Sequence, residues 1–133
     1  MSELKRILYI EDEPDIQAIA KIALESLGGF EIKICSSGEE AIANAVSFMP
    51  DLLLMDVMMP GLNGPDTYSI LREMPALIDI PAIFMTAKVQ TSEVDEYKKI
   101  GALGVIAKPF DPMTLADQIK TIYQSYSDSS KKK

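Results

Sequence analysis

Short runs of apolar residues alternate along the chain with longer segments in which apolar residues recur every three or four positions. The short runs are typical of strands buried on both faces of a parallel sheet, and the longer segments are typical of amphipathic helices. The expected strands lie at residues 6–10, 30–35, 51–56, 82–86 and 104–107. The expected helices cover residues 14–27, 38–48, 65–74, 92–100 and 111–126. This alternation predicts an α/β domain with a parallel five-stranded sheet covered by helices on both faces.

Residues at the expected helix ends agree with this prediction. Pro14 is suited to the first turn of a helix, and Gly28 followed by Gly29 is typical of a helix C-terminus. Ser37 with Glu40 three residues later forms a capping-box pattern, in which both side chains accept hydrogen bonds from backbone N–H groups at the helix start. We therefore expect a helix that begins directly after Ser37.

Length and composition limit the classes of protein that this chain can represent. Its 133 residues suit one domain. The single cysteine, Cys35, cannot form an intrachain disulfide, and no apolar run approaches the roughly 20 residues that span a bilayer, so we expect a cytoplasmic protein. The formal net charge of -7 repels nucleic acid and anionic membranes, which argues against both as direct partners. Because the chain has no histidine, it cannot form histidine-based hydrolase triads or His-containing zinc sites.

Four of the expected strands end in polar groups of different kinds. These groups are Glu11 with Asp12, then Asp56, then Thr86, and finally Lys108. In a parallel sheet such ends meet at one edge, where ligands bind. Two carboxylates about 5 Å apart repel by roughly 3 kcal/mol at an effective dielectric constant near 20. The acids beside the lysine therefore predict a site for a divalent cation, and their hard oxygen ligands favour Mg²⁺.

The same residues suit the transfer of a phosphoryl group. Asp56, at the end of the most apolar run, can attack phosphorus and form an acyl phosphate. The Lys108 ammonium would offset charge on the phosphoryl oxygens, and the Thr86 hydroxyl could donate a hydrogen bond to one of them. We therefore interpret Asp56, Thr86 and Lys108 as the residues that carry the chemistry.

The ordered set Glu11–Asp12, Asp56, Thr86 and Lys108–Pro109–Phe110 resembles the receiver domain of two-component response regulators, of the stand-alone CheY-like kind. The resemblance covers nearly the whole chain. We assign residues 4–126 to the receiver domain and residues 127–133 to a disordered basic tail. The resemblance implies a flavodoxin-like (βα)5 fold, a three-layer sandwich with parallel strands in the order 2-1-3-4-5.

The resemblance also implies roles for the site residues. Asp56 would be phosphorylated by a sensor histidine kinase or a histidine phosphotransfer protein, and the phosphorylated chain would bind a downstream protein effector. Mg²⁺ would be held by Asp12, by Asp56, by the backbone carbonyl of Met58, and by Glu11 through water. The chain would be a signalling module of a phosphorelay and not an enzyme.

Two further expectations follow for the last strand. Lys108 would contact the phosphoryl group, and the Lys108–Pro109 peptide bond is expected to be cis. Many receivers carry Tyr or Phe three residues before this lysine, where the ring reports phosphorylation, but this chain has Val105. We therefore expect the phosphorylation state to be transmitted by the loop after Thr86 and by the helix that follows it.

Two alternative functions use related chemistry. A phosphohydrolase of the haloacid dehalogenase type also has a nucleophilic aspartate and Mg²⁺, but it places a second aspartate two residues later, where this chain has Met58. A flavodoxin-like FMN-binding protein needs a hydroxyl-rich phosphate loop after the first strand. Glu11, Asp12 and Glu13 would repel that phosphate. Both alternatives are therefore disfavoured.

Overall fold

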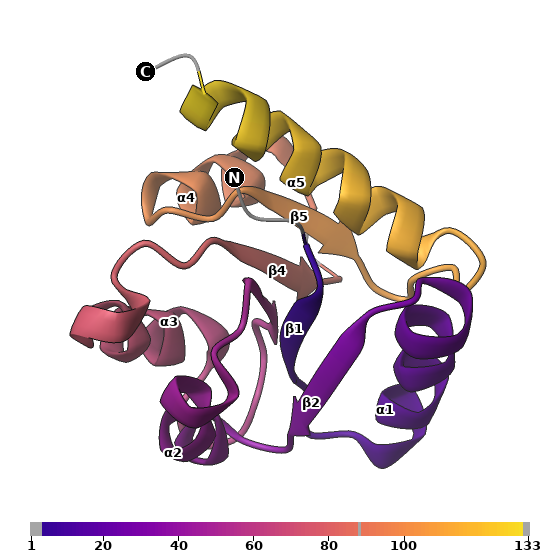
Figure 1. The fold of residues 1–133 in the computed structure, drawn as a ribbon, viewed down its shortest axis with the longest axis horizontal. Helices are drawn as coiled ribbons and strands as arrows, with labels where there is room; N and C mark the ends of the chain where they lie inside the picture. Colours follow the sequence, from indigo (N-terminus) through magenta and orange to yellow (C-terminus); the bar gives the residue numbers. More distant parts are fainter. Residues whose placement is uncertain (1–3, 88, 132–133) are drawn as a thin grey trace.

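Parallel strands form one five-stranded sheet at the centre of the protein (Figure 1). The computed structural model describes residues 4–87 and 89–131. The strands are β1 (Arg6–Ile10), β2 (Glu31–Cys35), β3 (Leu52–Asp56), β4 (Ala82–Thr86) and β5 (Gly104–Ala107). They lie in the order β2-β1-β3-β4-β5. The predicted flavodoxin-like order 2-1-3-4-5 is therefore confirmed, and each predicted strand agrees with the observed one to within a residue.

Helices cover both faces of the sheet and complete a three-layer sandwich (Figure 1). The described helices are α1 (Pro14–Lys21), the π-helical η1 (Ile22–Leu27), α2 (Gly38–Phe48), α3 (Gly64–Arg72), the 3₁₀ turn η2 (Pro75–Leu77), α4 (Thr91–Lys99) and α5 (Leu115–Lys131). Helices α1 and α5 lie on one face, and α2, α3 and α4 lie on the other. This arrangement is the one that an alternating strand–helix sequence favours.

The core is divided by the sheet into two apolar layers. Side chains that face α1 and α5 include Ile7, Tyr9, Leu52, Leu54, Ile83, Met85 and Ile106. Side chains that face the other helices include Leu8, Ile10, Leu53, Met55, Ala82 and Phe84. Every residue of β3 is buried, which explains its unbroken apolar sequence. Each buried leucine of this strand contributes about 1.5–3 kcal/mol relative to an exposed one.

The first predicted helix differs from the observed one in its second half. Residues 14–21 form a regular α-helix, but residues 22–27 continue as a wider π-helical turn. Of the predicted apolar stripe, Ala23 and Leu24 are buried, whereas Ile19 and Leu27 are exposed. The π-helical turn does not keep the 3.6-residue repeat of an α-helix, so Leu27 no longer falls on the face that packs against the sheet.

The last helix also differs from the prediction at both ends. It begins at Leu115 after a turn in which Asp111 accepts backbone hydrogen bonds, so its start is later than predicted. It continues to Lys131, and the assignment of residues 127–133 to a disordered tail is therefore wrong for residues 127–131. Once a helix has formed, each added residue gains a hydrogen bond without a new nucleation cost, so a polar segment can extend it. Residues 132 and 133 lie outside the described part.

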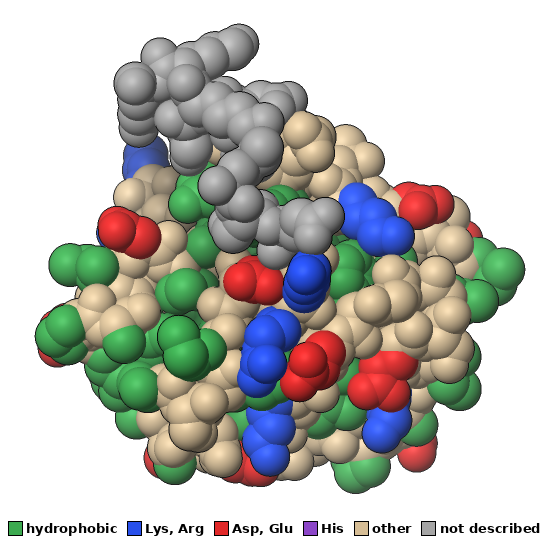
Figure 2. Space-filling model, in the orientation of Figure 1, with side chains coloured by type: hydrophobic (Ala, Val, Ile, Leu, Met, Phe, Trp, Pro, Cys, Tyr) green, Lys and Arg blue, Asp and Glu red, His purple; other side chains and the backbone are tan. Residues whose placement is uncertain are grey.

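The surface shown in Figure 2 carries basic and acidic side chains side by side near its centre. Hydrophobic side chains gather on its left side, where Figure 1 places α3 and the turn that follows it. Exposed apolar residues of the structure include Ile78, at 59%, and Met49. Within the described residues, none of the helices is both long enough and apolar enough to cross a membrane.

The predicted capping box of α2 is present with one change of partner. The Ser37 hydroxyl accepts a hydrogen bond from the backbone N–H of Glu40 at 3.0 Å. The Glu40 carboxylate accepts one from the backbone N–H of Ser36 at 2.7 Å, rather than from Ser37 itself. Both contacts satisfy donors that would otherwise lack partners at the helix start.

We predict that Ser37→Ala lowers the free energy of unfolding by about 1 kcal/mol, because the Glu40 N–H loses its acceptor. Ser47→Ala is the matched control, since the Ser47 hydroxyl only donates to a carbonyl near the other end of α2. Its effect should stay below about 0.5 kcal/mol. Urea unfolding measures the free energy of unfolding of both variants. An equal loss of free energy in the two would show that the Ser37 cap contributes no more than an ordinary serine of the same helix.

Candidate functional site

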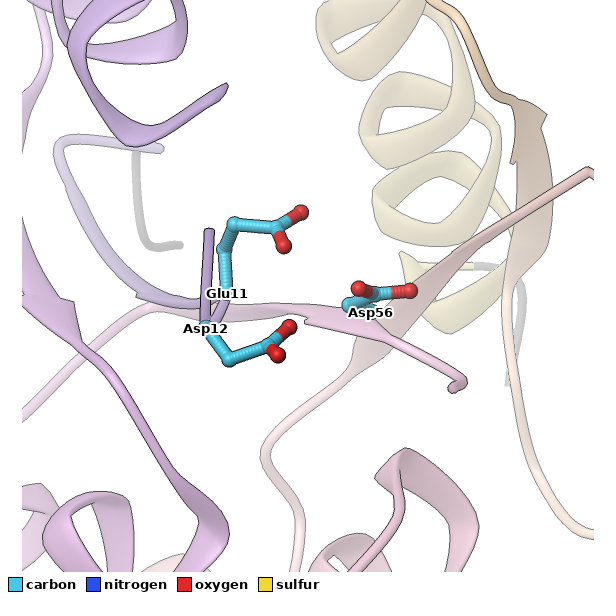
Figure 3. Close-up of side chains that lie close together, drawn as sticks. All are labelled: Glu11, Asp12 and Asp56. Atoms are coloured by element: carbon cyan, nitrogen blue, oxygen red, sulfur yellow. The ribbon is translucent and has the colours of Figure 1, made fainter. Parts of the chain in front are cut away.

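Three acidic side chains meet at the carboxyl edge of the sheet. Glu11 and Asp12 follow β1, and Asp56 is the last residue of β3. Their carboxylates point toward a common space (Figure 3), and one ligand oxygen from each lies within 4.8 Å of the others. Glu11 and Asp56 are buried and Asp12 is half-buried. The structure therefore brings together the three acids that the sequence predicted to meet.

Lys108, which follows β5, supplies the opposite charge. Its Nζ donates hydrogen bonds to Glu11 Oε1 at 2.9 Å and to Asp56 Oδ2 at 3.0 Å, and the side chain is only 16% exposed. Burial alone would lower the pKa of Lys108, but the hydrogen bonds to Glu11 and Asp56 outweigh burial and raise the pKa above its usual value. The Lys108–Pro109 peptide bond is cis, as the resemblance implied.

Glu11 is fully buried, and its pKa departs from the usual value of a glutamate. Its Oε2 accepts a hydrogen bond from the backbone N–H of Glu13 at 3.2 Å. Burial, together with the charge of Asp56, raises the pKa of Glu11 to about 7, against the hydrogen bond from Lys108, which acts to lower the pKa. Negative charge on Glu11 is therefore costly without cationic neighbours.

Thr86 and Met58 lie at the ends of the two neighbouring strands. Thr86 is buried at the end of β4, and its carbonyl accepts a hydrogen bond from the Lys108 backbone N–H at 3.0 Å. Met58 lies two residues beyond Asp56, and its backbone N–H donates to Asp56 Oδ1 at 3.3 Å. The Met58 side chain is 66% exposed. Both residues thus border the acids, and the roles assigned to them from the sequence remain predictions.

Two polar side chains beneath the acids were not identified from the sequence. The Tyr9 hydroxyl lies 3.5 Å from Glu11 Oε1, and burial together with the nearby charges of Glu11 and Asp56 raises the pKa of Tyr9. The Gln17 amide donates to the Glu11 carbonyl and to the Ser36 hydroxyl. Tyr9 could have been found, because strand alternation places residues 9 and 11 on the same face.

Comparison with known proteins identifies the family. The model of the response regulator receiver domain matches residues 7–120. The chain belongs to this family. Receiver domains are signalling modules of two-component systems, which accept phosphate from histidine kinases and generally bind Mg²⁺ at an acidic pocket. The acidic cluster of this receiver lies where that pocket is expected.

Curated relatives include full-length regulators. The chain is 33% identical over 116 residues to the DNA-binding response regulator MtrA of Mycolicibacterium smegmatis, a match that covers 87% of this receiver and 49% of MtrA. It is 34% identical over 118 residues to the phosphate regulon transcriptional regulatory protein PhoB of Pseudomonas aeruginosa, covering 89% of this receiver and 51% of PhoB. The chain thus spans about half the length of these relatives.

Solved structures of receivers share the fold. The chemotaxis response regulator CheY4 of Vibrio cholerae superposes with a TM-score of 0.82 at 26% identity, covering 90% of this receiver and 99% of CheY4. The receiver domain of a signal transduction histidine kinase from Syntrophus aciditrophicus superposes with a TM-score of 0.76 at 30% identity, covering 91% of each chain. The receiver fold therefore occurs among these neighbours in a chemotaxis response regulator and in a signal transduction histidine kinase.

The residues present suit a bound Mg²⁺. Three carboxylates offer hard oxygen ligands from two different strand ends, and Mg²⁺ sites in proteins usually combine a few carboxylates with water. Lys108 offsets part of the negative charge but also occupies hydrogen-bonding positions on Glu11 and Asp56. A cation must therefore bind the remaining carboxylate oxygens close to the Lys108 ammonium. Mg²⁺ suits this position because it keeps several bound waters, which can lie between the two positive charges.

We predict that Asp12→Ala raises the stability of the metal-free protein by roughly 1 kcal/mol, because one of three mutually repelling acids is removed. The same variant should lose the stabilisation that Mg²⁺ gives the wild type. Thermal unfolding with and without Mg²⁺ measures both effects. Asp15→Ala, which removes an exposed acid outside the cluster, is the control. A lower melting temperature of metal-free Asp12→Ala would contradict the prediction.

Proposed function

We propose that this chain is the phosphoacceptor of a two-component phosphorelay, in which Asp56 is phosphorylated in a Mg²⁺-dependent reaction. The observation that carries the proposal is the position of the Asp56 carboxylate, which ends a fully buried strand, contacts Lys108, and lies beside Glu11 and Asp12. The donor is a sensor histidine kinase or a histidine phosphotransfer protein. Phosphorylation then changes the surface that a downstream protein recognises.

The reaction transfers a phosphoryl group between two side chains. One carboxylate oxygen of Asp56 forms a bond to phosphorus, while the bond from phosphorus to the donor's imidazole nitrogen breaks and its electron pair stays with that nitrogen. The Lys108 ammonium offsets charge on the phosphoryl oxygens, and the Thr86 hydroxyl donates a hydrogen bond to one of them. Bound Mg²⁺ would supply further positive charge to those oxygens.

We propose that Asp12, Asp56 and the Met58 carbonyl hold the metal directly, and that Glu11 acts through water. The Glu11 carboxylate already accepts hydrogen bonds from Lys108 and from the Glu13 backbone, which supports an indirect contact. Met58 stands where a dehalogenase-type phosphohydrolase would have its acid–base aspartate. A thioether cannot transfer a proton at neutral pH, so Met58 cannot serve as that acid–base residue. We therefore propose that the chain is a phosphorylated signalling protein and that it does not hydrolyse small phosphate esters.

An apolar hollow next to Lys108 supports a protein donor. Its volume is about 280 Å³, and it is lined by Ile16, Ile19, Lys108, Pro109, Phe110 and Pro112. Ile19 is 46% exposed there. A donor histidine must come within bonding distance of the buried Asp56, so the protein that carries the histidine must cover this rim. Exposed apolar side chains at the rim favour such a contact.

The partners that follow from this proposal are proteins. The net charge of -7 disfavours direct contact between these 133 residues and nucleic acid. Any binding of DNA in the same pathway would therefore be carried out by other residues or by the effector. Phosphohistidine donors are charged from ATP, and we propose that the chain acts in the cytoplasm.

Asp56→Asn should abolish phosphorylation, because an amide is a poor nucleophile and a poor Mg²⁺ ligand. The test is intact mass after incubation with acetyl phosphate, with and without Mg²⁺. We expect the wild type to gain one phosphoryl group only when Mg²⁺ is present, and Asp56→Asn to gain none. Asp66→Asn, at an exposed position in α3, should behave as the wild type. Undiminished labelling of Asp56→Asn would refute the proposed phosphoacceptor.

Ile19→Glu should reduce phosphotransfer from a phosphorylated histidine protein about tenfold, because a charge at the apolar rim weakens docking by about 1.4 kcal/mol. Labelling by acetyl phosphate, which needs no docking surface, should be unchanged. The donor is the kinase that phosphorylates the wild type fastest in a purified panel. Ile78→Glu is the matched control, since Ile78 is similarly exposed but lies beyond α3. Equal effects of both variants would place the docking surface elsewhere.

A further inference from the structure

Tyr9 places a hydroxyl group inside the buried sheet. It interrupts the aliphatic run of β1, between Leu8 and Ile10, and its side chain is fully buried. In the sheet register it is paired with Ile34 of β2 and with Leu54 of β3, so it lies in an inner strand. A buried phenol is favourable only where its hydroxyl has a hydrogen-bond partner. The hydroxyl must therefore make a contact that an aliphatic side chain could not.

The ring of Tyr9 is fixed, whereas its hydroxyl proton can turn. The ring belongs to the apolar layer that faces α1 and α5, together with Ala20 of α1 and with Leu115 and Ile119 of α5. Close packing of this kind holds a ring in one position. The hydroxyl proton still rotates about its C–O bond. Tyr9 thus offers a donor at a fixed place that can turn toward an acceptor beside it.

The acceptor that the structure gives this hydroxyl is Glu11 Oε1, at 3.5 Å. Strand alternation puts residues 9 and 11 on the same face of the sheet, so the hydroxyl faces the carboxylate along the strand. Hydrogen bonds between a hydroxyl and an oxygen are usually about 2.7–2.8 Å long. The contact between Tyr9 and Glu11 is therefore only partly formed in the unmodified protein.

Lys108 shares the same acceptor. Its ammonium donates to Glu11 Oε1 at 2.9 Å. Hydrogen bonds from a charged donor are shorter and stronger than those from a neutral hydroxyl. The ammonium therefore takes the shorter distance to the shared oxygen, and the Tyr9 hydroxyl is the weaker second donor.

The other polar groups of Glu11 have partners of their own. Its backbone N–H donates to the Cys35 carbonyl at 3.0 Å, and its carbonyl accepts from the Gln17 amide. Its Oε2 accepts from the Glu13 backbone N–H at 3.2 Å. None of these three partners has a role in the proposed reaction. Oε1 differs, because its short hydrogen bond comes from Lys108, which the reaction also uses.

The proposed function requires Lys108 to contact a phosphoryl group on Asp56. In the unmodified protein the ammonium donates to both Glu11 and Asp56. A phosphoryl group carries more negative charge than a carboxylate, so it draws the ammonium away from Glu11. The fully buried Glu11 then loses its charged donor at Oε1. A buried carboxylate oxygen without a donor is unfavourable.

We propose that Tyr9 is a positioning residue of the phosphoacceptor site: its hydroxyl becomes the main donor to Glu11 Oε1 when Lys108 turns to the phosphoryl group, and it thereby keeps the Glu11 carboxylate in place. The exchange of donors rests on the proposed function. The oxygen that Tyr9 and Lys108 share is a feature of the unmodified protein.

The chemistry of a phenol suits this position. Burial and the charges of Glu11 and Asp56 raise the pKa of Tyr9, so the hydroxyl keeps its proton and remains a donor at neutral pH. A second ammonium at this place would cancel negative charge that a bound Mg²⁺ needs, and a phenylalanine would offer no donor. A tyrosine can hold Glu11 without adding charge to the site.

Tyr9→Phe tests this role, because it removes the hydroxyl and leaves the buried ring. With Mg²⁺ and beryllofluoride as the phosphoryl mimic, we expect calorimetry to give an affinity for beryllofluoride about fivefold weaker than that of the wild type. The affinity for Mg²⁺ alone should change by less than about twofold, because Lys108 then still bonds to Glu11. Tyr68→Phe is the matched control: it removes the hydroxyl of another buried tyrosine, which bonds to Gly101, and both affinities should match the wild type.

Two results of this measurement would overturn the proposal. An unchanged affinity of Tyr9→Phe for beryllofluoride would show that Glu11 needs no second donor. An equal loss of affinity for Mg²⁺ alone and for beryllofluoride would show that the hydroxyl only shapes the site and does not replace Lys108.

A comparison of double variants tests the shared oxygen without phosphoryl chemistry. Lys108→Met keeps most of the side-chain volume and removes the ammonium, so Tyr9 is then the donor left to Glu11 Oε1 within the described part of the chain. In metal-free protein, Tyr9→Phe should lower the melting temperature by less than about 2 °C in the wild type and by about 5 °C in the Lys108→Met background. Tyr68→Phe should lower it equally in both backgrounds.

Equal effects of Tyr9→Phe in the two backgrounds would show that Tyr9 and Lys108 do not share Glu11, and they would overturn the proposal. If the wild type binds no beryllofluoride and acetyl phosphate does not label Asp56, the proposed function fails. The melting temperatures then decide on their own whether Tyr9 holds Glu11 in the absence of Lys108.

Discussion

Repulsion among three carboxylates at one edge of the sheet is the constraint on which the site depends. Glu11, Asp12 and Asp56 lie near one another because they are at the ends of two adjacent strands of the buried sheet. Lys108 offsets this repulsion from β5, 97 residues after Glu11 in the sequence. The site is therefore complete only when the last strand has joined the sheet. The charge balance at the edge is therefore a property of the folded protein.

The same sheet divides the protein into a rigid part and a weakly held part. Strands β3 and β4 are buried along their whole length and place Asp56 and Thr86 precisely enough for chemistry on a small group. Helix α4 begins only five residues after Thr86 and has no fully buried residue among its described positions. Local opening requires the least free energy where few apolar contacts must be broken. The free energy needed to open α4 locally is therefore lower than the free energy needed to disturb the strands that carry the site.

Sequence patterns predicted the strands well because strands buried on both faces have a simple signature, an unbroken apolar run that ends in a polar residue. The order of the strands came from the family resemblance, since periodicity alone does not specify which strands are neighbours. The meeting of Glu11, Asp12, Asp56 and Lys108 followed from parallel topology and could be predicted before any coordinates.

Features that depend on packing between distant residues could not be predicted in this way. The π-helical turn after Lys21 and the extension of α5 to Lys131 depend on how each helix continues once it is docked, which hydrophobic periodicity does not record. The Tyr9 contact with Glu11 had a sequence signal in strand alternation, but the contacts of Arg72 with residue 100 cross 28 residues and had none.

The polarity of the contacts at the two ends of α4 explains why its ends differ so much in attachment. An arginine at a helix C-terminus interacts favourably with the helix dipole as well as with the free carbonyls. Arg72 of α3 therefore stabilises the C-terminal end of α4 both by its charge and by its hydrogen bond to Ile100. An acid in the first turn also suits the dipole, but Glu93 gains this interaction while one of its oxygens is buried without a donor among the residues that the structure describes. The dipole interaction persists if the first turn moves into solvent, whereas the desolvation cost does not. Glu93 therefore stabilises the first turn as a helix and at the same time disfavours its packing against the rest of the protein.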